Sequence, residues 1–242
     1  MNERNDGAVF VTTRWSMVLR AGSNSASAQE ALSQLYNTYR YPLYAFVRRQ
    51  GNSPHDAEDL THGFFAYLLE KQTLNRVQRE KGKFRSFLLG CLTNFLANEW
   101  DKRRAAKRGG GQVPTSLDVD SAEARYAQEA TDGRTPESIY ERTWAATVVA
   151  RGLSLLSEQY SASGKEELFR ILKPHLMDDA DEEEGYNELG LQLGMKPGAV
   201  RMAMLRMRQH FTFLLQQEIA DTVTDPSEIE GELRYLIAAA AR

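Results

Sequence analysis

The stretch FRSFLLGCLTNFLANEWDKRRAAKRGGG, residues Phe84–Gly111, combines an amphipathic helix, a basic cluster and a glycine break. At 100° per residue its large apolar side chains fall on one broad face, which is expected to pack in a core. The opposite face carries small and amide side chains: Ser86, Gly90, Asn94, Asn98 and Asp101. An ordinary solvated face would carry more Lys and Glu, so this helix is expected to present a surface to a partner.

The same helix ends in the densest positive cluster of the chain, formed by Lys102, Arg103, Arg104, Lys107 and Arg108. Cationic side chains bind phosphates, whereas amide side chains can read the edges of bases. Both chemistries on one helix predict a nucleic acid as the partner.

Composition limits this binding to a local patch. The 242 residues carry a formal net charge of -3, which excludes a generally basic, histone-like binder. The single cysteine, Cys91, lies on the apolar helix face and is expected to be a small core residue in a reducing compartment. The chain has no long apolar run and no signal-peptide pattern, so we expect a cytoplasmic protein without membrane insertion.

Two helices are expected before this stretch, besides a short one over 13–19. Apolar spacing predicts a long helix over Ala28–Gln50, which Pro42 should kink or divide. A second helix is predicted from Pro54 to Lys71, with an acidic first turn that suits the helix dipole. This second helix has more large apolar side chains than one buried stripe requires. Part of its surface is therefore expected either to join the core or to dock another protein.

Residues 109–135 are rich in Gly, Ser, Thr, Asp and Pro and are predicted to be a flexible linker with one helical turn over Ala122–Gln128. A long helix should follow from Pro136 to Tyr160, and another over Lys165–Met177, disturbed by its proline. The acidic run Asp178–Glu184 is either a solvated loop or a negative screen beside a DNA-binding surface.

A helix-turn-helix is predicted near the end of the chain. Tyr186–Leu193 forms the first helix, a Gly-containing turn follows, and Pro197 takes the first position of the second helix. Helical spacing places Val200, Met204, Met207 and Phe211 in the core. It turns Ala199, Arg201, Met202, Arg206 and Gln209 outward, where small residues and arginines suit a major groove.

The predicted fold is all-α, with two helical domains joined by a flexible linker. Residues 1–108 form the first domain, 109–135 the linker, and 136–242 the second domain with a C-terminal extension. The extension and the segment Lys165–Glu184 are each expected to be an extra packing element or a regulatory contact.

Three motifs in this order resemble the bacterial sigma-70 family, in particular its extracytoplasmic-function (ECF) group. They are DAEDLTHGFFAYLLEK (Asp56–Lys71), FRSFLLGCLTNFLANEWDKRR (Phe84–Arg104) and YNELGLQLGMKPGAVRMAMLRMR (Tyr186–Arg208). The resemblance implies, in turn, a helix that binds core RNA polymerase, a helix that reads the promoter −10 element, and a −35 helix-turn-helix. Promoter DNA and core polymerase would be the partners, together with a separate anti-sigma factor or other regulatory protein.

The resemblance also implies roles for individual residues. Polymerase contacts would come from Asp56, Glu58, Asp59, Leu60, Phe64 and Leu68. The −10 contacts would come from Asn94, Asn98, Lys102, Arg103 and Arg104. The −35 contacts would come from Lys196, Ala199, Arg201, Met202, Arg206 and Arg208.

Other functions are less well supported. The four histidines lack metal-site spacing, and the chain has neither a phosphate-binding loop nor a nucleophile elbow, so no enzyme activity, metal or cofactor is expected. The main alternative is a regulator that binds duplex DNA through the second domain alone. Such a regulator has no use for a polymerase-binding helix over Asp56–Lys71. A protein-binding scaffold is a third possibility, but it leaves the basic cluster without a role.

Overall fold

The computed structural model describes residues 26–70, 83–106, 119–129, 134–177, 183–220, 223 and 225–240. Across these ranges all regular structure is helical, which confirms the predicted all-α class. The helix expected over 13–19, Lys107 and Arg108, the glycines 109–111 and the acidic residues 178–182 lie outside the described residues.

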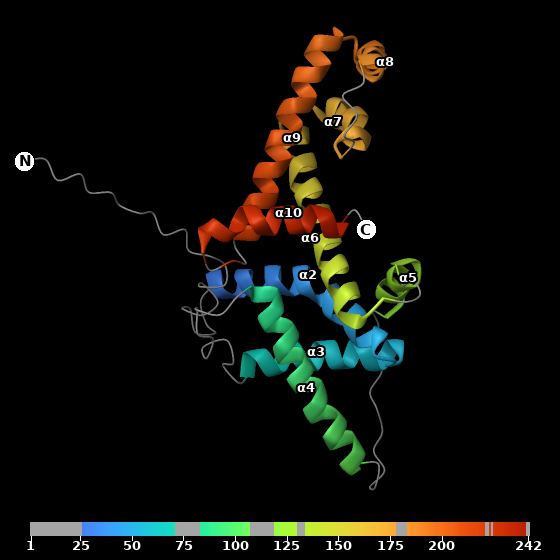
Figure 1. The fold of residues 1–242 in the computed structure, drawn as a ribbon, viewed down its shortest axis with the longest axis vertical. Helices are drawn as coiled ribbons and strands as arrows, with labels where there is room; N and C mark the ends of the chain where they lie inside the picture. Colours follow the sequence, from blue (N-terminus) through green and yellow to red (C-terminus); the bar gives the residue numbers. More distant parts are fainter. Residues whose placement is uncertain are drawn as a thin grey trace, which may run out of the picture.

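The helices are arranged in an elongated body with α4 and α9 toward its two ends (Figure 1). Their bounds are α2 Ala26–Arg49, α3 Pro54–Glu70, α4 Phe84–Ala106, α5 Val119–Glu129, α6 Pro136–Ala162, α7 Glu166–Leu172, α8 Glu183–Leu193, α9 Pro197–Ala220 and α10 Ile229–Ala240. Short 3₁₀ turns cover Lys173–His175 and Pro226–Glu228. These bounds agree with the predicted helices to within a few residues, since each helix carries its own periodic apolar pattern.

Two prolines affect the helices differently. The sequence predicts that Pro42 kinks or divides its helix; α2 continues through this buried residue as one helix, so no division occurs. Its ribbon changes direction along its length, as a proline kink would produce (Figure 1). Pro174 acts as predicted, because α7 stops at Leu172 and the chain continues as a 3₁₀ turn.

Helix α6 packs along α2, and aromatic side chains fill the contact between them. Tyr39, Tyr140 and Trp144 are each at most 1% exposed, and Phe46 meets Tyr140 edge-on at 6.4 Å between ring centroids. Burial raises the pKa of both the Tyr39 and the Tyr140 hydroxyl well above the usual value. The helix predicted to begin the second domain thus shares its core with the first, while the domain limits themselves stay a prediction.

The C-terminal half of α6 packs against α9, and the C-terminal helix α10 covers both. Gly152 of α6 lies directly against Leu215 and Phe211 of α9. Helix α10 contributes Leu233 and Leu236, both buried, to the same core. The extension of the chain is therefore a packing element in this structure.

A segment expected to be flexible linker contains helix α5, which docks on α2. The Glu123 carboxylate accepts hydrogen bonds from the Arg48 guanidinium at 2.7 and 2.8 Å and from the Tyr44 hydroxyl at 2.7 Å. The Arg48 guanidinium, more than the Tyr44 hydroxyl, holds the pKa of Glu123 below its usual range. The prediction of one helical turn here was too short, because these contacts stabilise a helix of 11 residues.

The close contact at Gly152 predicts a large effect of one methyl group. A Cβ at this position would lie 2.8 Å from the Leu215 side chain and 3.1 Å from the Phe211 ring, both buried. Gly152→Ala should therefore lower the free energy of unfolding by about 1–3 kcal/mol, measured by urea denaturation. The matched control is Gly231→Ala in α10, where a Cβ meets nothing within 4 Å. It should raise stability by about 0.5–1 kcal/mol. Equal effects of the two substitutions would contradict this account of the α6–α9 contact.

Candidate nucleic-acid interface

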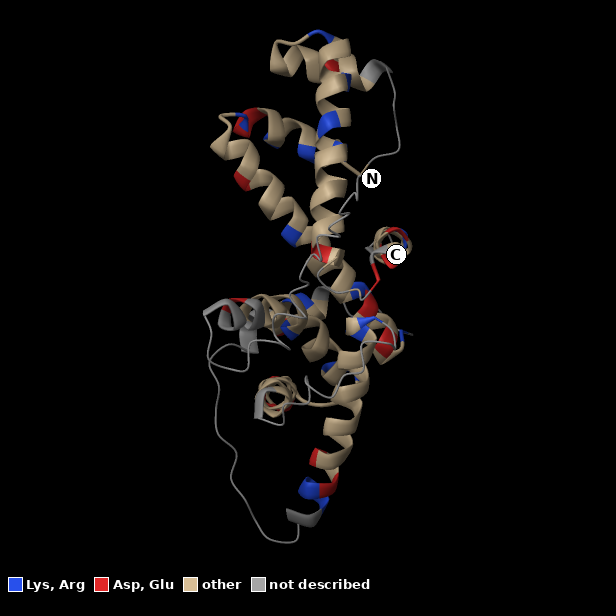
Figure 2. Ribbon diagram, turned by 90° about the vertical axis from the view of Figure 1, so that its left-hand side faces the viewer, with Lys and Arg blue, Asp and Glu red and all other residues tan. Residues whose placement is uncertain are grey.

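Helix α4 buries one face and exposes the other, as its sequence predicts. Leu88, Leu92 and Leu96 are at most 2% exposed and anchor it in the core. The opposite face is exposed, including Asn94 and Asn98. The last turns of α4 extend beyond α3 at one end of the molecule, and Figure 2 shows charged residues gathered on this end. The amide stripe and the cationic end are thus open to a ligand.

The cations at the end of α4 take part in exposed ion pairs. Lys102 lies 2.7 Å from Glu99, and Arg103 lies 2.8 Å from Asp56 in the first turn of α3. The hydrogen bond from the Ser53 hydroxyl, followed by that from Arg103, lowers the pKa of Asp56. Ion pairs with this much solvent access contribute little to stability, so a phosphate group could replace the carboxylates at small cost. Arg104 is exposed on the same turn.

The predicted polymerase-binding residues divide into two groups. Asp56 and Asp59 are partly exposed on α3, on the side facing the end of α4. Glu58, Leu60, Phe64 and Leu68 are at most 4% exposed. The buried four hold α3 in the core, so in this arrangement their side chains offer no surface to a partner. A groove of ≈ 450 Å³ beside Asp59, lined also by Gly63, Tyr67 and Arg103, runs between α3 and α4.

Burial of Glu58 depends on its ion pairs. Its carboxylate lies 2.5 Å from the Arg40 guanidinium of α2 and 3.1 Å from Nε2 of His62. The same His62 nitrogen lies 2.8 Å from the Tyr36 hydroxyl. A carboxylate at 0% exposure needs such partners, because an unpaired buried charge is strongly destabilising. Glu58 therefore joins α2 to α3, a role that periodicity alone did not indicate.

Helices α8 and α9 are joined by a tight turn that depends on two glycines. Gly194 adopts a left-handed φ of 62°, and the Met195 N–H donates to the Gly190 carbonyl at 2.9 Å. A Cβ on Gly190 would lie 2.7 Å from the Met195 carbonyl oxygen, so the turn can approach α8 only because Gly190 has no side chain. Pro197 opens α9 as predicted, while a DNA-binding helix-turn-helix formed by α8 and α9 stays a prediction.

Along α9 the predicted inward and outward faces agree with the structure. Val200, Met204, Met207 and Phe211 are buried. Lys196, Ala199, Arg201, Met202 and Arg206 are exposed, and Gln209 is exposed beyond them. Arg208 is partly buried and donates to the His175 carbonyl at 3.2 Å, which ties α9 to the 3₁₀ turn after α7. Its guanidinium thus has a structural contact in addition to the predicted role.

Trp100 is an exposed aromatic residue that is not among the residues predicted to form a site. It follows Leu92 and Leu96 at four-residue spacing, so the helical period alone assigns it to the apolar face. Its side chain is 38% exposed. The reason is that the last turns of α4 extend beyond α3. Only the tertiary arrangement could reveal this.

Two general features of the described residues complete the geometry. No cluster of three or more His, Cys, Asp or Glu side chains suited to a metal ion occurs among them. None of the described helices has the length and hydropathy needed to span a bilayer.

Comparison with known families identifies the part of the chain that contains α3 and α4. Residues 35–106 match the family model of sigma-70 region 2. No curated protein and no solved structure gave a match to the chain.

Residues 35–106 are therefore a sigma-70 region 2 domain, which indicates a sigma factor of the sigma-70 family. Region 2 implies promoter recognition together with core RNA polymerase. Sigma factors are non-catalytic subunits of RNA polymerase, so the expectation that the chain is not an enzyme is confirmed by this family. The match ends at Ala106, the last residue of α4, and the ECF group and a second DNA-binding region stay predictions.

Proposed function

We propose that this protein is an ECF-group sigma factor that binds core RNA polymerase and directs it to −10 and −35 promoter elements. The observation that carries the proposal is the region 2 match, because it covers the helix that exposes both asparagines and the cationic end. Helix α4 would read the −10 element, and the helices α8 and α9 would form a region 4-like unit for the −35 element.

At the −10 element the protein must stabilise bases that have left the duplex. A carboxamide offers donors and acceptors to the exposed Watson–Crick edge of such a base. Asn94 and Asn98 lie one turn apart on the exposed face of α4, and both can meet the same strand. Lys102, Arg103 and Arg104 would hold phosphates, which adds salt-dependent affinity without sequence information.

At the −35 element the reading surface would be the start of α9. Ala199 and Met202 offer small and apolar contacts in a major groove, where thymine methyl groups are accessible. Lys196, Arg201 and Arg206 add charge for guanine edges or phosphates. Arg208 would act on the flank of this surface, because it also contacts the turn after α7.

Polymerase would dock on the exposed edge of α3. Asp56 and Asp59 supply negative charge there, beside the groove between α3 and α4. The buried residues Glu58, Leu60, Phe64 and Leu68 would act indirectly, by fixing the position of this edge. A separate anti-sigma factor or other regulatory protein remains part of the proposal.

The alternative, a regulator that binds duplex DNA without polymerase, is tested together with the proposal. Run-off transcription with core polymerase and a pool of promoter fragments should yield transcripts only when the protein is added. Binding to duplex fragments without transcription from any template would favour the regulator and contradict the sigma factor.

Asn94→Ala should reduce open-complex formation at a selected promoter by about tenfold and duplex binding by much less, because one base contact contributes roughly 1–3 kcal/mol. Permanganate reactivity of unpaired thymines measures the first quantity, and a gel shift measures the second. Ser86→Ala, at the other end of the same exposed stripe, is the matched control and should leave both unchanged. Equal losses in the two assays would contradict base reading by Asn94.

Asp59→Lys should weaken association with core polymerase by about tenfold or more, because it reverses the charge of a surface that is expected to face polymerase. Binding of the protein to duplex −35 DNA should stay within about twofold of the wild-type value, since α9 lies elsewhere in the molecule. Glu30→Lys, an exposed charge reversal on α2, is the control. Co-purification with core polymerase measures the effect, and an equal loss in the control would show that net charge alone matters.

A further inference from the structure

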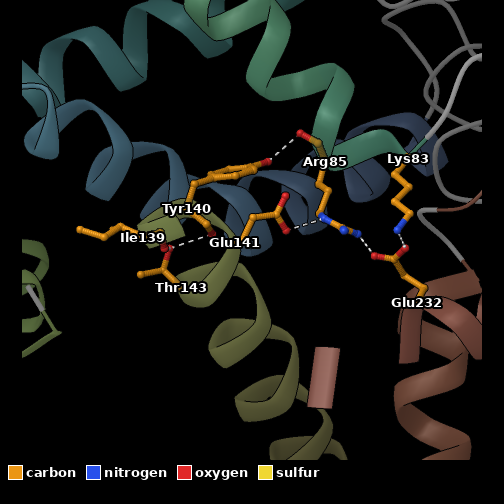
Figure 3. Close-up of polar contacts among 7 residues, drawn as sticks. All are labelled: Lys83, Arg85, Ile139, Tyr140, Glu141, Thr143 and Glu232. Atoms are coloured by element: carbon orange, nitrogen blue, oxygen red, sulfur yellow. Dashed lines mark hydrogen bonds and ion pairs between the residues drawn. The ribbon is translucent and has the colours of Figure 1, made fainter. Parts of the chain in front are cut away.

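Four charged side chains from three helices and their flanks meet beside the start of α4, and we call them the Arg85 cluster: Lys83, Arg85, Glu141 and Glu232. Arg85 pairs with Glu141 of α6 at 2.6 Å and with Glu232 of α10 (Figure 3). Lys83 lies 2.8 Å from the same Glu232. The cluster thus joins segments that are far apart in the sequence.

Aromatic rings enclose the guanidinium of this cluster. Its central carbon lies 4.7 Å from the centre of the Trp144 ring and 4.5 Å from that of Tyr235. The Tyr140 hydroxyl donates to the Arg85 carbonyl at 3.0 Å, so the backbone of α4 is held as well as the side chain (Figure 3). Arg85 is 5% exposed and Glu232 1%. Buried charges with this many directional contacts favour a single geometry over a sliding contact.

The fixed geometry continues from α6 to α9. Gly152 allows the two helices to approach until Leu215 and Phe211 touch the α6 backbone, and α10 covers the junction. Helices α4, α6 and α9 therefore form one connected path. The cationic end of α4 and the start of α9 lie at opposite ends of this path (Figure 1).

The rise per residue of an α-helix sets an upper limit to the distance between the two ends of this path, which we call its reach. At 1.5 Å per residue, α4 covers about 28 Å from Arg85 to its cationic end, and α9 covers about 21 Å from Leu215 to Arg201. Helix α6 adds about 16 Å between its two contacts. With helix axes about 10 Å apart at each contact, the reach is at most about 85 Å. Positions −10 and −35 are separated by roughly 85 Å of B-form DNA.

We infer that the Arg85 cluster sets the distance and orientation between the two DNA-reading helices, and so determines which spacer length between promoter elements the protein accepts. This inference rests on the proposed function, in which α4 and α9 read the two elements. Because about 85 Å is an upper limit for this path, the intact body cannot follow a longer spacer unless a contact on the path opens. Helix α10 takes part in the cluster at the start of α4 through Glu232.

The experiment compares transcription from promoters whose spacers differ by single base pairs, using the full-length protein and core polymerase. Glu232→Gln removes the buried negative charge with little change of shape. The wild type should show a narrow optimum of spacer length. In the variant, the ratio of transcription at the optimal spacer to transcription at a spacer two base pairs longer should fall about tenfold. Lys83→Gln removes only the outer partner of Glu232. It should reduce the same discrimination between spacer lengths by a smaller factor.

Glu230→Gln is the matched control, because Glu230 lies on α10 but is exposed and outside the cluster. Its spacer profile should equal that of the wild type. Profiles of Glu232→Gln and Lys83→Gln that keep the wild-type shape would overturn the inference, even if transcription rose or fell equally at all spacers. No transcription by the wild type at any spacer would instead contradict the proposed function itself.

Discussion

The buried guanidinium of Arg85 is the interaction on which the arrangement of the helices depends. Removing a charge from water costs several kcal/mol unless it is paired and hydrogen-bonded. Arg85 meets this condition only where α6 supplies Glu141 and α10 supplies Glu232. The start of helix α4 is therefore tied to a helix in the middle of the chain and to its C-terminal helix.

The aromatic core between α2 and α6 also ties the first part of the chain to a helix in its middle. Tyr39, Phe46, Tyr140 and Trp144 are buried together, so separating the sigma-70 region 2 domain from α6 would expose a large apolar surface. Helix α5 adds a polar contact through Glu123 and Arg48. The segment between the two halves of the chain is in part a packed element, and the free protein holds its two exposed helical surfaces in a defined relation.

Within region 2, α3 contributes to the core and also carries a partly exposed acidic edge. Its acidic first turn continues into a buried Glu58 that pairs with Arg40, while Asp56 and Asp59 remain partly exposed. Neighbouring carboxylates thus differ in environment because a helix turns by 100° per residue. The exposed pair lies next to the cationic end of α4, and the two surfaces adjoin along a single groove.

The sequence by itself determined the helices, the buried and exposed faces of α4 and α9, and the turn before Pro197. These features follow from local periodicity and from the backbone preferences of Gly and Pro. Tertiary structure alone decided that Glu58, Leu60, Phe64 and Leu68 are core residues, that Trp100 is exposed, and that Arg85 pairs with Glu141 and Glu232. Periodicity shows which side of a helix is apolar, but not how far the neighbouring helix extends along it. It also cannot identify a charge partner more than 50 residues away, because such a pair depends on how the whole chain packs.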